Sequence, residues 1–174
     1  MAGAPLDTLY SAMLDDASLA VPELINLYER GTEDLRAAVA GMTPAELAAR
    51  PIPGKWSTLE VVCHLADCEQ FNSERLKRTA ALEKPLLVGI DPTNYPAALR
   101  YELADLEEEL KLIELTRRQT ARMLRRLPDS VWQRTAIHTE IGLITMRQLL
   151  LHPLRHMLHH LPTIAEKRAA LLGK

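Results

Sequence analysis

Apolar residues recur along most of the chain at a spacing of about 3.6 residues, as an amphipathic α-helix requires. Four long stretches carry this pattern: about residues 15–40, 57–84 and 96–127, and a fourth from Thr145 onward. No stretch reads as a convincing strand, and the chain contains only seven glycines. Four long amphipathic helices in one small domain predict an all-α fold, a four-helix bundle.

Local signals mark where helices begin. At Thr43, Ser57 and Thr145 a hydroxyl residue is followed three residues later by Glu or Gln, which is the spacing of a capping box. The first predicts a short connecting helix, and the other two predict the starts of the second and fourth long helices. Residues 83–95, rich in turn formers, are expected to be a loop, and residues 133–145 an irregular connection.

Several features of the long helices have ordinary interpretations. In the third helix the acidic residues lie toward the N-terminal half, and five arginines, from Arg117 to Arg126, lie toward the C-terminus, as the helix dipole favours. We expect these arginines on a solvated face, and we expect Leu99 and Leu103 to face inward. In the first helix, Gly31 is expected to be a tolerated weak point.

The size and composition predict one globular domain. With 174 residues, 47% hydrophobic and 25% charged, the chain is expected to be a single domain over residues 1–174, with a core at about 15–171. A formal net charge of −2 gives no general attraction to phosphate backbones or anionic lipid, so we expect no nucleic-acid partner. No run approaches the roughly 20 apolar residues that span a bilayer, and no basic segment precedes the first hydrophobic residues. We therefore expect no membrane partner and a cytoplasmic location.

Four of the six histidines lie in the segment HPLRHMLHHL. Because successive residues of a helix turn by about 100°, His152, His156, His159 and His160 share one arc. The pairs His152/His156 and His156/His160 both have the i, i+4 spacing with which two imidazoles can bind one metal ion. Spacing alone leaves both pairs open, and a solvated histidine patch is the alternative.

A third histidine lies on another helix. His64 is in phase with Val61 and Phe71, so it belongs to the apolar stripe of the second helix. A lone histidine there is usually a core residue with a satisfied hydrogen bond. Burying three neutral imidazoles would, however, cost several kcal/mol unless each found a partner, and a divalent cation supplies all three at once. The nearest alternative ligands are Asp67, which we interpret as a supporting or surface residue, and Cys68, which we interpret as core.

His138, His159 and Cys63 are not expected to be metal ligands. His138 is off the arc, and it is either exposed to solvent or near the mouth of a site. His159 is rotated by 100° from His160 and is expected to contact a neighbouring residue or water. Cys63 lies five residues from Cys68 on the same expected helix, so the two are not expected to form a disulfide.

Three segments resemble the DinB/YfiT-like family of metalloenzymes: GKWSTLEVVCHLADCE, TEIGLITMRQLLLH and HMLHHLPTI. Together with the lengths of the helices between them, the resemblance covers nearly the whole chain from about Leu19 onward. The resemblance implies an up-and-down type of four-helix bundle, commonly a homodimer, with a three-histidine site for zinc, nickel or iron. The matching residues are His64, His156 and His160, so the resemblance favours the second histidine pair.

One feature departs from the family pattern. Pro153 and Pro162 fall within the last helix, where the family has uninterrupted helix. Each removes a backbone donor and is expected to kink or loosen the helix, which could move His160 relative to His156.

The resemblance also implies a chemistry, because relatives include S-transferases and an isomerase that use low-molecular-weight thiols. We expect a metal-dependent enzyme that activates such a thiol for attack on a small electrophilic substrate. A metal-dependent hydrolase and a non-catalytic metal-binding or dimerisation bundle are the alternatives. Arg147 and Arg155 flank the metal helix, but we interpret them as exposed helix charges and not as ligands for a thiol carboxylate.

Overall fold

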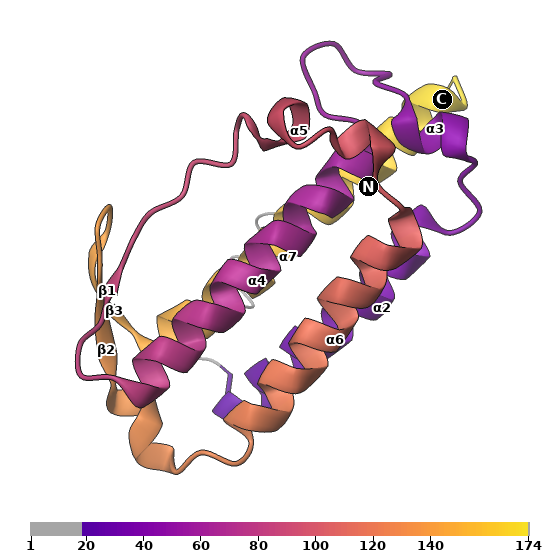
Figure 1. Ribbon diagram of the computed structural model, residues 1–174. Coiled ribbons are helices and arrows are strands. Elements are labelled where there is room, and N and C mark those ends of the chain that lie inside the picture. Colours follow the sequence, from indigo (N-terminus) through magenta and orange to yellow (C-terminus); the bar gives the residue numbers. More distant parts are fainter. Residues whose placement is uncertain (1–18, 174) are drawn as a thin grey trace, which may run out of the picture.

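The computed structural model describes residues 19–173, in which four long helices form a bundle (Figure 1). They are α2 (Val21–Val39), α4 (Thr58–Ala81), α6 (Leu106–Leu124) and α7 (Met146–Leu171). The predicted all-α four-helix bundle is confirmed. The expected start of the first helix near residue 15 lies outside the described residues.

The chain path contains one long crossover. Helices α2 and α7 run toward the end of the bundle at which α4 and α6 begin, because the starts of α2 and α7 share a core cluster with the ends of α4 and α6. The connection over residues 82–105 therefore returns along the length of the bundle, and α4 and α6 run in the same direction (Figure 1). In this connection the path departs from a plain up-and-down order.

The predicted helix starts are confirmed by their hydrogen bonds. The side chain of Ser57 accepts from the backbone N–H of Glu60 at 3.1 Å, and Glu60 accepts in return from the backbone of Ser57. Thr43 caps the short helix α3 (Pro44–Ala48) and Thr145 caps α7 in the same reciprocal way. Each capping box satisfies donors that the first helical turn leaves unpaired, and so fixes where the helix begins.

The third helix is shorter than predicted. Instead of running over 96–127, the chain forms the short helix α5 (Tyr95–Ala98) and the 3₁₀ turn η1 (Tyr101–Leu103) before α6 begins. Arg100 takes a left-handed conformation with φ of 57°, which ends the helical path, and Asp105 then caps α6. Leu99 and Leu103, which were expected to face inward, are exposed as a result.

Two segments predicted as loop or irregular connection form a small sheet. Strand β1 (Leu86–Leu87) pairs in parallel with β2 (Thr135–His138), and β2 pairs antiparallel with β3 (Gly142–Thr145). Strands of two to four residues are too short for an alternating pattern to identify them in the sequence. The sheet lies beside the bundle at the end where α4 finishes and α7 begins (Figure 1).

Helix α7 continues through both internal prolines. It is helical over Met146–Leu171, so Pro153 and Pro162 do not end it, and His156 and His160 lie on one helix. The carbonyl oxygen of Pro153 accepts a hydrogen bond from Nη2 of Arg117 at 3.2 Å. A neighbouring helix thus supports α7 at the first proline.

The expectation that Arg117 lies on a solvated face was wrong. Its side chain is 1% exposed and pairs with Glu69 of α4 at 2.7 Å. It also donates to the backbone carbonyl of Tyr28 at 3.1 Å, and the Tyr28 hydroxyl donates to Glu69. A Cβ at Gly31 would lie 2.5 Å from Nη1 of Arg117, so this glycine leaves room for the guanidinium and is not merely a weak point of α2.

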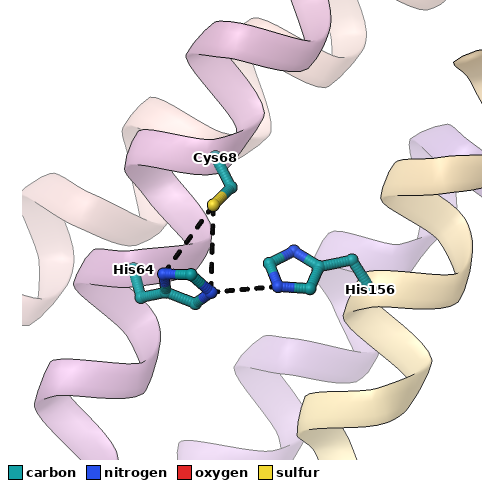
Figure 2. Close-up of side chains that lie close together, drawn as sticks. All are labelled: His64, Cys68 and His156. Carbon is teal, nitrogen blue, oxygen red and sulfur yellow. Dashed lines mark hydrogen bonds between the residues drawn. The ribbon is translucent and has the colours of Figure 1, made fainter. Parts of the chain in front are cut away.

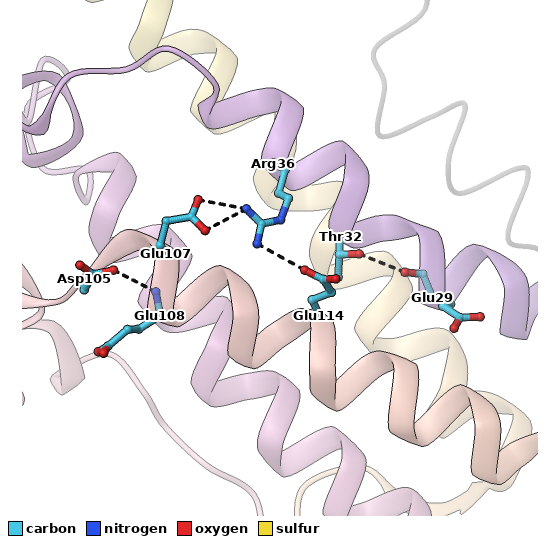
Figure 3. A network of polar contacts seen from close by, with 7 residues as sticks. All are labelled: Glu29, Thr32, Arg36, Asp105, Glu107, Glu108 and Glu114. Atoms are coloured by element: carbon cyan, nitrogen blue, oxygen red, sulfur yellow. Dashed lines mark hydrogen bonds and ion pairs between the residues drawn. The ribbon is translucent and has the colours of Figure 1, made fainter.

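Charges on the outer seam between α2 and α6 are arranged differently. Arg36 contacts Glu107 at 3.0 Å and Glu114 at 3.3 Å, and all three side chains are at least a third exposed (Figure 3).

Among residues 19–173, no helix is both long enough and apolar enough to cross a bilayer.

Candidate metal centre

The candidate site lies between α4 and α7. His64 is in the second turn of α4 and is 5% exposed, and Val61 and Leu65 on the same helix are buried as well. Its ring is tilted against Trp56, with the ring centroids 4.9 Å apart. The capping box at Ser57 fixes the start of α4 and therefore the turn on which His64 faces α7.

Three imidazole rings meet at this point. The Nε2 atoms of His64 and His156 lie 2.9 Å apart, and those of His156 and His160 lie 3.1 Å apart. Figure 2 shows His64 and His156 facing each other from α4 and α7. The ring centroids of His64 and His160 are 5.1 Å apart, so the third ring joins the same cluster. The structure brings together the three histidines that the resemblance implies as ligands.

The surroundings keep these imidazoles neutral. Burial, followed by the neighbouring imidazoles, lowers the pKa of His156 from its usual 6.5 to about 2, and burial likewise lowers the pKa of His160 to about 3. Burial also lowers the pKa of His64, although the charge of Asp67 opposes the shift. Neutral imidazole is the form that binds metal ions, because its unprotonated nitrogen offers a lone pair.

The cluster fits a divalent cation. Nitrogen ligands about 2.0–2.1 Å from a tetrahedral ion lie about 3.3–3.4 Å from one another. The His64–His156 and His156–His160 nitrogens, 2.9 and 3.1 Å apart, are close to this separation, so each of these two pairs needs only small rotations of the side chains to share an ion. Nδ1 of His160 is buried without a hydrogen-bond partner among the described residues, whereas Nε2 of the same ring lies 3.1 Å from Nε2 of His156.

Cys68 offers a different third ligand. It lies one turn after His64, and its Sγ atom is 3.7 Å from Nδ1 and 3.8 Å from Nε2 of that ring (Figure 2). Ligand atoms of His64, Cys68 and His156 all lie within 4.8 Å of one another. Cys68 is only partly buried, so its interpretation as a core residue was wrong. Burial raises the pKa of its thiol to about 12, which disfavours the thiolate unless a cation is bound.

The other candidates fall outside the ring cluster. Asp67 is partly buried and accepts a hydrogen bond from the hydroxyl of Tyr101, and its expected supporting role stays a prediction. His152 and His159 are exposed, although their rings lie beside His156 and His160, respectively. His138 on β2 was expected to be either exposed to solvent or near the mouth of a site. It is 8% exposed and lines the pocket beside the imidazoles, so the structure shows the second position.

A pocket of about 320 Å³ opens beside the cluster. His64, Cys68 and His156 form one part of its wall, and the residues of the small sheet form another. Helix α4 extends the wall to Arg75, and apolar side chains such as Phe71 and Leu149 fill much of the rest. The chain therefore encloses space for a small molecule next to the imidazole nitrogens.

A comparison with models of protein families shows which family the chain belongs to. The profile of the DinB superfamily matches residues 27–164. The chain belongs to the DinB superfamily. This confirms the resemblance that the sequence segments carry.

Two similar proteins are provisionally named metal-dependent hydrolases. One, from Oceanobacillus iheyensis, is 28% identical over 147 residues, which are 84% of this chain and 85% of the relative. The other, YfiT from Bacillus subtilis, is 31% identical over 144 residues, which are 82% of this chain and 80% of YfiT.

Solved structures agree with the fold. YfiT, described as having an unusual four-helix bundle topology, matches with a TM-score of 0.81 at 25% identity, over 90% of this chain and 91% of YfiT. A mycothiol-dependent maleylpyruvate isomerase matches with a TM-score of 0.65 at 14% identity, over 83% of this chain and 60% of the isomerase. At that identity the second likeness shows the fold alone.

Sequence reasoning missed one pocket residue of this DinB-superfamily chain, Arg75, and left two positions open for another, His138. Arg75 follows His64 by eleven residues, about three helical turns, so it lies on the same face of α4. That spacing was a usable signal. His138 could not be placed from the sequence, because its position depends on the unpredicted pairing of β2 with β1 and β3.

Proposed function

We propose that His64, His156 and His160 hold a divalent zinc, nickel or iron ion, and that the chain is a metal-dependent enzyme acting on a small molecule. We further propose that the nucleophile is a low-molecular-weight thiol, which makes the enzyme a thiol-dependent S-transferase. The observation that carries the proposal is the close approach of three neutral imidazoles, two of which, His64 and His156, line a pocket of about 320 Å³.

The chemistry follows from the charge of the ligands. Three neutral imidazoles leave a divalent ion its full charge and at least one open coordination position, which is typical of catalytic sites. When bound, such an ion stabilises a thiolate or a hydroxide at neutral pH. The chain's part is to hold the rings on two capped helices, to keep them unprotonated by burial, and to enclose the reactants between α4, α7 and the sheet.

A thiol is our first choice because the family resemblance includes thiol-dependent enzymes, and the pocket has room for more than a water molecule beside the rings. A hydrolase is the second candidate, and the names of two relatives at 28% and 31% identity favour it. A non-catalytic metal-binding bundle is the third. The homodimer implied by the resemblance stays a prediction, which sedimentation of the purified chain would measure.

The test uses the metal-loaded chain and the uncharged electrophile monochlorobimane. We expect conjugate formation only when a thiol is added, and its loss in His156→Ala, with His159→Ala as the matched control because His159 is exposed on the same helix. Ester or amide hydrolysis without any thiol would favour the hydrolase. No turnover with any thiol or hydrolysable substrate, despite a stoichiometric metal ion, would contradict an enzyme.

A further inference from the structure

Arg75 lies in the pocket at a distance from the ring cluster. It is on the same face of α4 as His64, about three turns further along, and side chains on a helix tilt toward the N-terminus, here toward the rings. The side chain is half-buried, and burial lowers the pKa of the guanidinium. Arginine nevertheless keeps its charge at any physiological pH. The pocket thus contains a fixed cation that is partly removed from water.

The guanidinium is incompletely satisfied by the protein. Nη2 donates to the carbonyl oxygen of Val88 at 2.7 Å, and this is the one hydrogen bond that Arg75 makes to the described part of the chain. Arginine carries five N–H donors. No carboxylate of residues 19–173 lies within 4.0 Å of it, whereas buried Arg117 has a carboxylate partner at 2.7 Å. Most of the hydrogen-bonding capacity of Arg75 therefore remains available.

A second donor comes from the sheet. Nδ1 of His138 accepts a hydrogen bond from the backbone N–H of Glu140 at 3.2 Å, so in the neutral ring the proton is on Nε2. The ring is 8% exposed and lines the same pocket as Arg75. The side chain of Glu140 also lines the pocket, is exposed, and lies close enough to Arg75 to act on it electrostatically.

We propose that Arg75 binds a carboxylate on the molecule that occupies the pocket, with His138 as a second donor. A guanidinium can bind a carboxylate through two parallel N–H bonds, and such charge-assisted bonds are stronger than neutral ones. Apolar walls at Phe71 and Leu149 fit a hydrocarbon body between the carboxylate and the ring cluster. The inference rests on the proposed function for its reaction and names the substrate class: small organic acids with an apolar body, whether the acid is the thiol or the electrophile.

Direct binding tests this recognition. Ligand-observed NMR would compare 3-phenylpropionate with its uncharged amide on the full zinc-loaded chain, and again on the metal-free chain. We expect the acid to bind at least tenfold tighter than the amide in both states. In Arg75→Gln the two ligands should bind within threefold of each other. Arg78→Gln, on the same helix and paired with Glu74, is the control and should retain the preference.

Several outcomes would overturn the inference. These are equal binding of acid and amide to the unaltered chain, a preference retained in Arg75→Gln, and a preference that disappears when the metal is removed, since the ion would then be the carboxylate partner. Conversely, Glu140→Gln should tighten binding of the acid severalfold, because it removes a competing carboxylate. Weaker binding of the acid to that variant would also contradict the proposal.

Turnover identifies which reactant carries the acid. The thiol arm compares 3-mercaptopropionate with its methyl ester, using monochlorobimane as electrophile, and the electrophile arm compares an acidic with an esterified electrophile at constant thiol. If Arg75→Gln raises the KM of the acid but not of its ester in one of the two arms, the proposal is supported, and that arm shows whether the thiol or the electrophile carries the carboxylate. A rise in neither arm contradicts it. If no thiol supports turnover while acid binding still depends on Arg75, the proposed function fails and this inference stands.

Discussion

Two buried polar clusters in the same bundle meet the cost of burial in opposite ways. Around Arg117, the charge of Glu69, the hydroxyl of Tyr28 and two backbone carbonyls complete one another, so the cluster is closed. In the imidazole cluster of His64, His156 and His160, three neutral rings face one another, and no carboxylate of the described residues 19–173 pairs with them. The difference teaches that the first cluster is a structural tie among the four helices, whereas the second lacks such a partner among residues 19–173 and, as we propose, is completed by a bound ion.

Breaking the closed cluster should give the largest loss of stability. Glu69→Ala leaves the guanidinium of Arg117 buried without its counter-charge, so we expect the free energy of unfolding to fall by about 3–5 kcal/mol. Urea unfolding measures this change. The double variant Glu69→Met/Arg117→Met should lose less than Glu69→Ala alone, because neither charge remains. A loss below about 1 kcal/mol in the single variant would mean that the pair does not matter.

Completing the open cluster should raise stability by a comparable amount. Zinc at a free concentration 1,000 times its dissociation constant should add about 4 kcal/mol to the free energy of unfolding, because the ion binds the folded chain. His156→Ala should abolish this gain, and Arg36→Ala, far from the rings on the outer seam, should retain it. The urea midpoint with and without zinc is the measurement, and equal gains in the chain and in His156→Ala would refute the assignment.

Filling the space beside the closed cluster should have a moderate effect. Gly31→Ala places a Cβ 2.5 Å from Nη1 of Arg117, so we expect a loss of about 1–3 kcal/mol where a glycine-to-alanine change in a helix normally stabilises. Thermal unfolding of Gly31→Ala beside Arg36→Ala would show the difference. A rise in Tm for Gly31→Ala would contradict the close approach.

Acid should weaken the metal-free open cluster. The pKa values of its three imidazoles lie below the usual 6.5, so the unfolded chain takes up protons first as the pH falls, and the free energy of unfolding decreases below pH 6.5. The decline continues toward the folded pKa values, about 3 for His160 and about 2 for His156. Between pH 7 and 5 the chain should therefore lose more stability than His156→Gln/His160→Gln. If the free energy of unfolding depended on pH in the same way in the chain and in the double variant, His156 and His160 would titrate as they do in water.

The outer charged seam should contribute least. Arg36→Ala removes contacts of 3.0 and 3.3 Å to carboxylates on α6, but these groups are exposed and screened by salt, so we expect a change below about 1 kcal/mol. A loss equal to that of Glu69→Ala would remove the distinction between buried and exposed pairs.

The helices were predictable because their signals are local. The apolar period of 3.6 residues and the capping boxes predicted where α4 and α7 begin, and the capping hydrogen bonds confirm these starts. The break at Arg100 was not predictable, since the leucine period runs on through Leu99 and Leu103. The sheet was missed because its strands stabilise one another across the chain, with Leu86 of β1 beside Ile137 of β2.

The candidate site was partly predictable for the same reason. Phase placed His64 inward, and the i, i+4 spacing offered both His152/His156 and His156/His160, so the family resemblance was needed to choose the second pair, whose nitrogens the structure brings together with that of His64. The burial of Arg117 was not predictable, because charge sorting along α6 is equally typical of a solvated helix. Gly31 in the middle of α2 was the one feature of the sequence that hinted at a large side chain packed closely against that helix. That the rings hold a metal stays a prediction.

Metal content measured by mass spectrometry on the purified chain and on single variants tests the central claim most directly. The account predicts one divalent ion per chain, its loss in His64→Ala, His156→Ala and His160→Ala, and its retention in His159→Ala and Cys68→Ser. No stoichiometric ion after reconstitution with zinc, nickel or iron, or an ion retained in His160→Ala and lost in Cys68→Ser, would contradict the three-imidazole site.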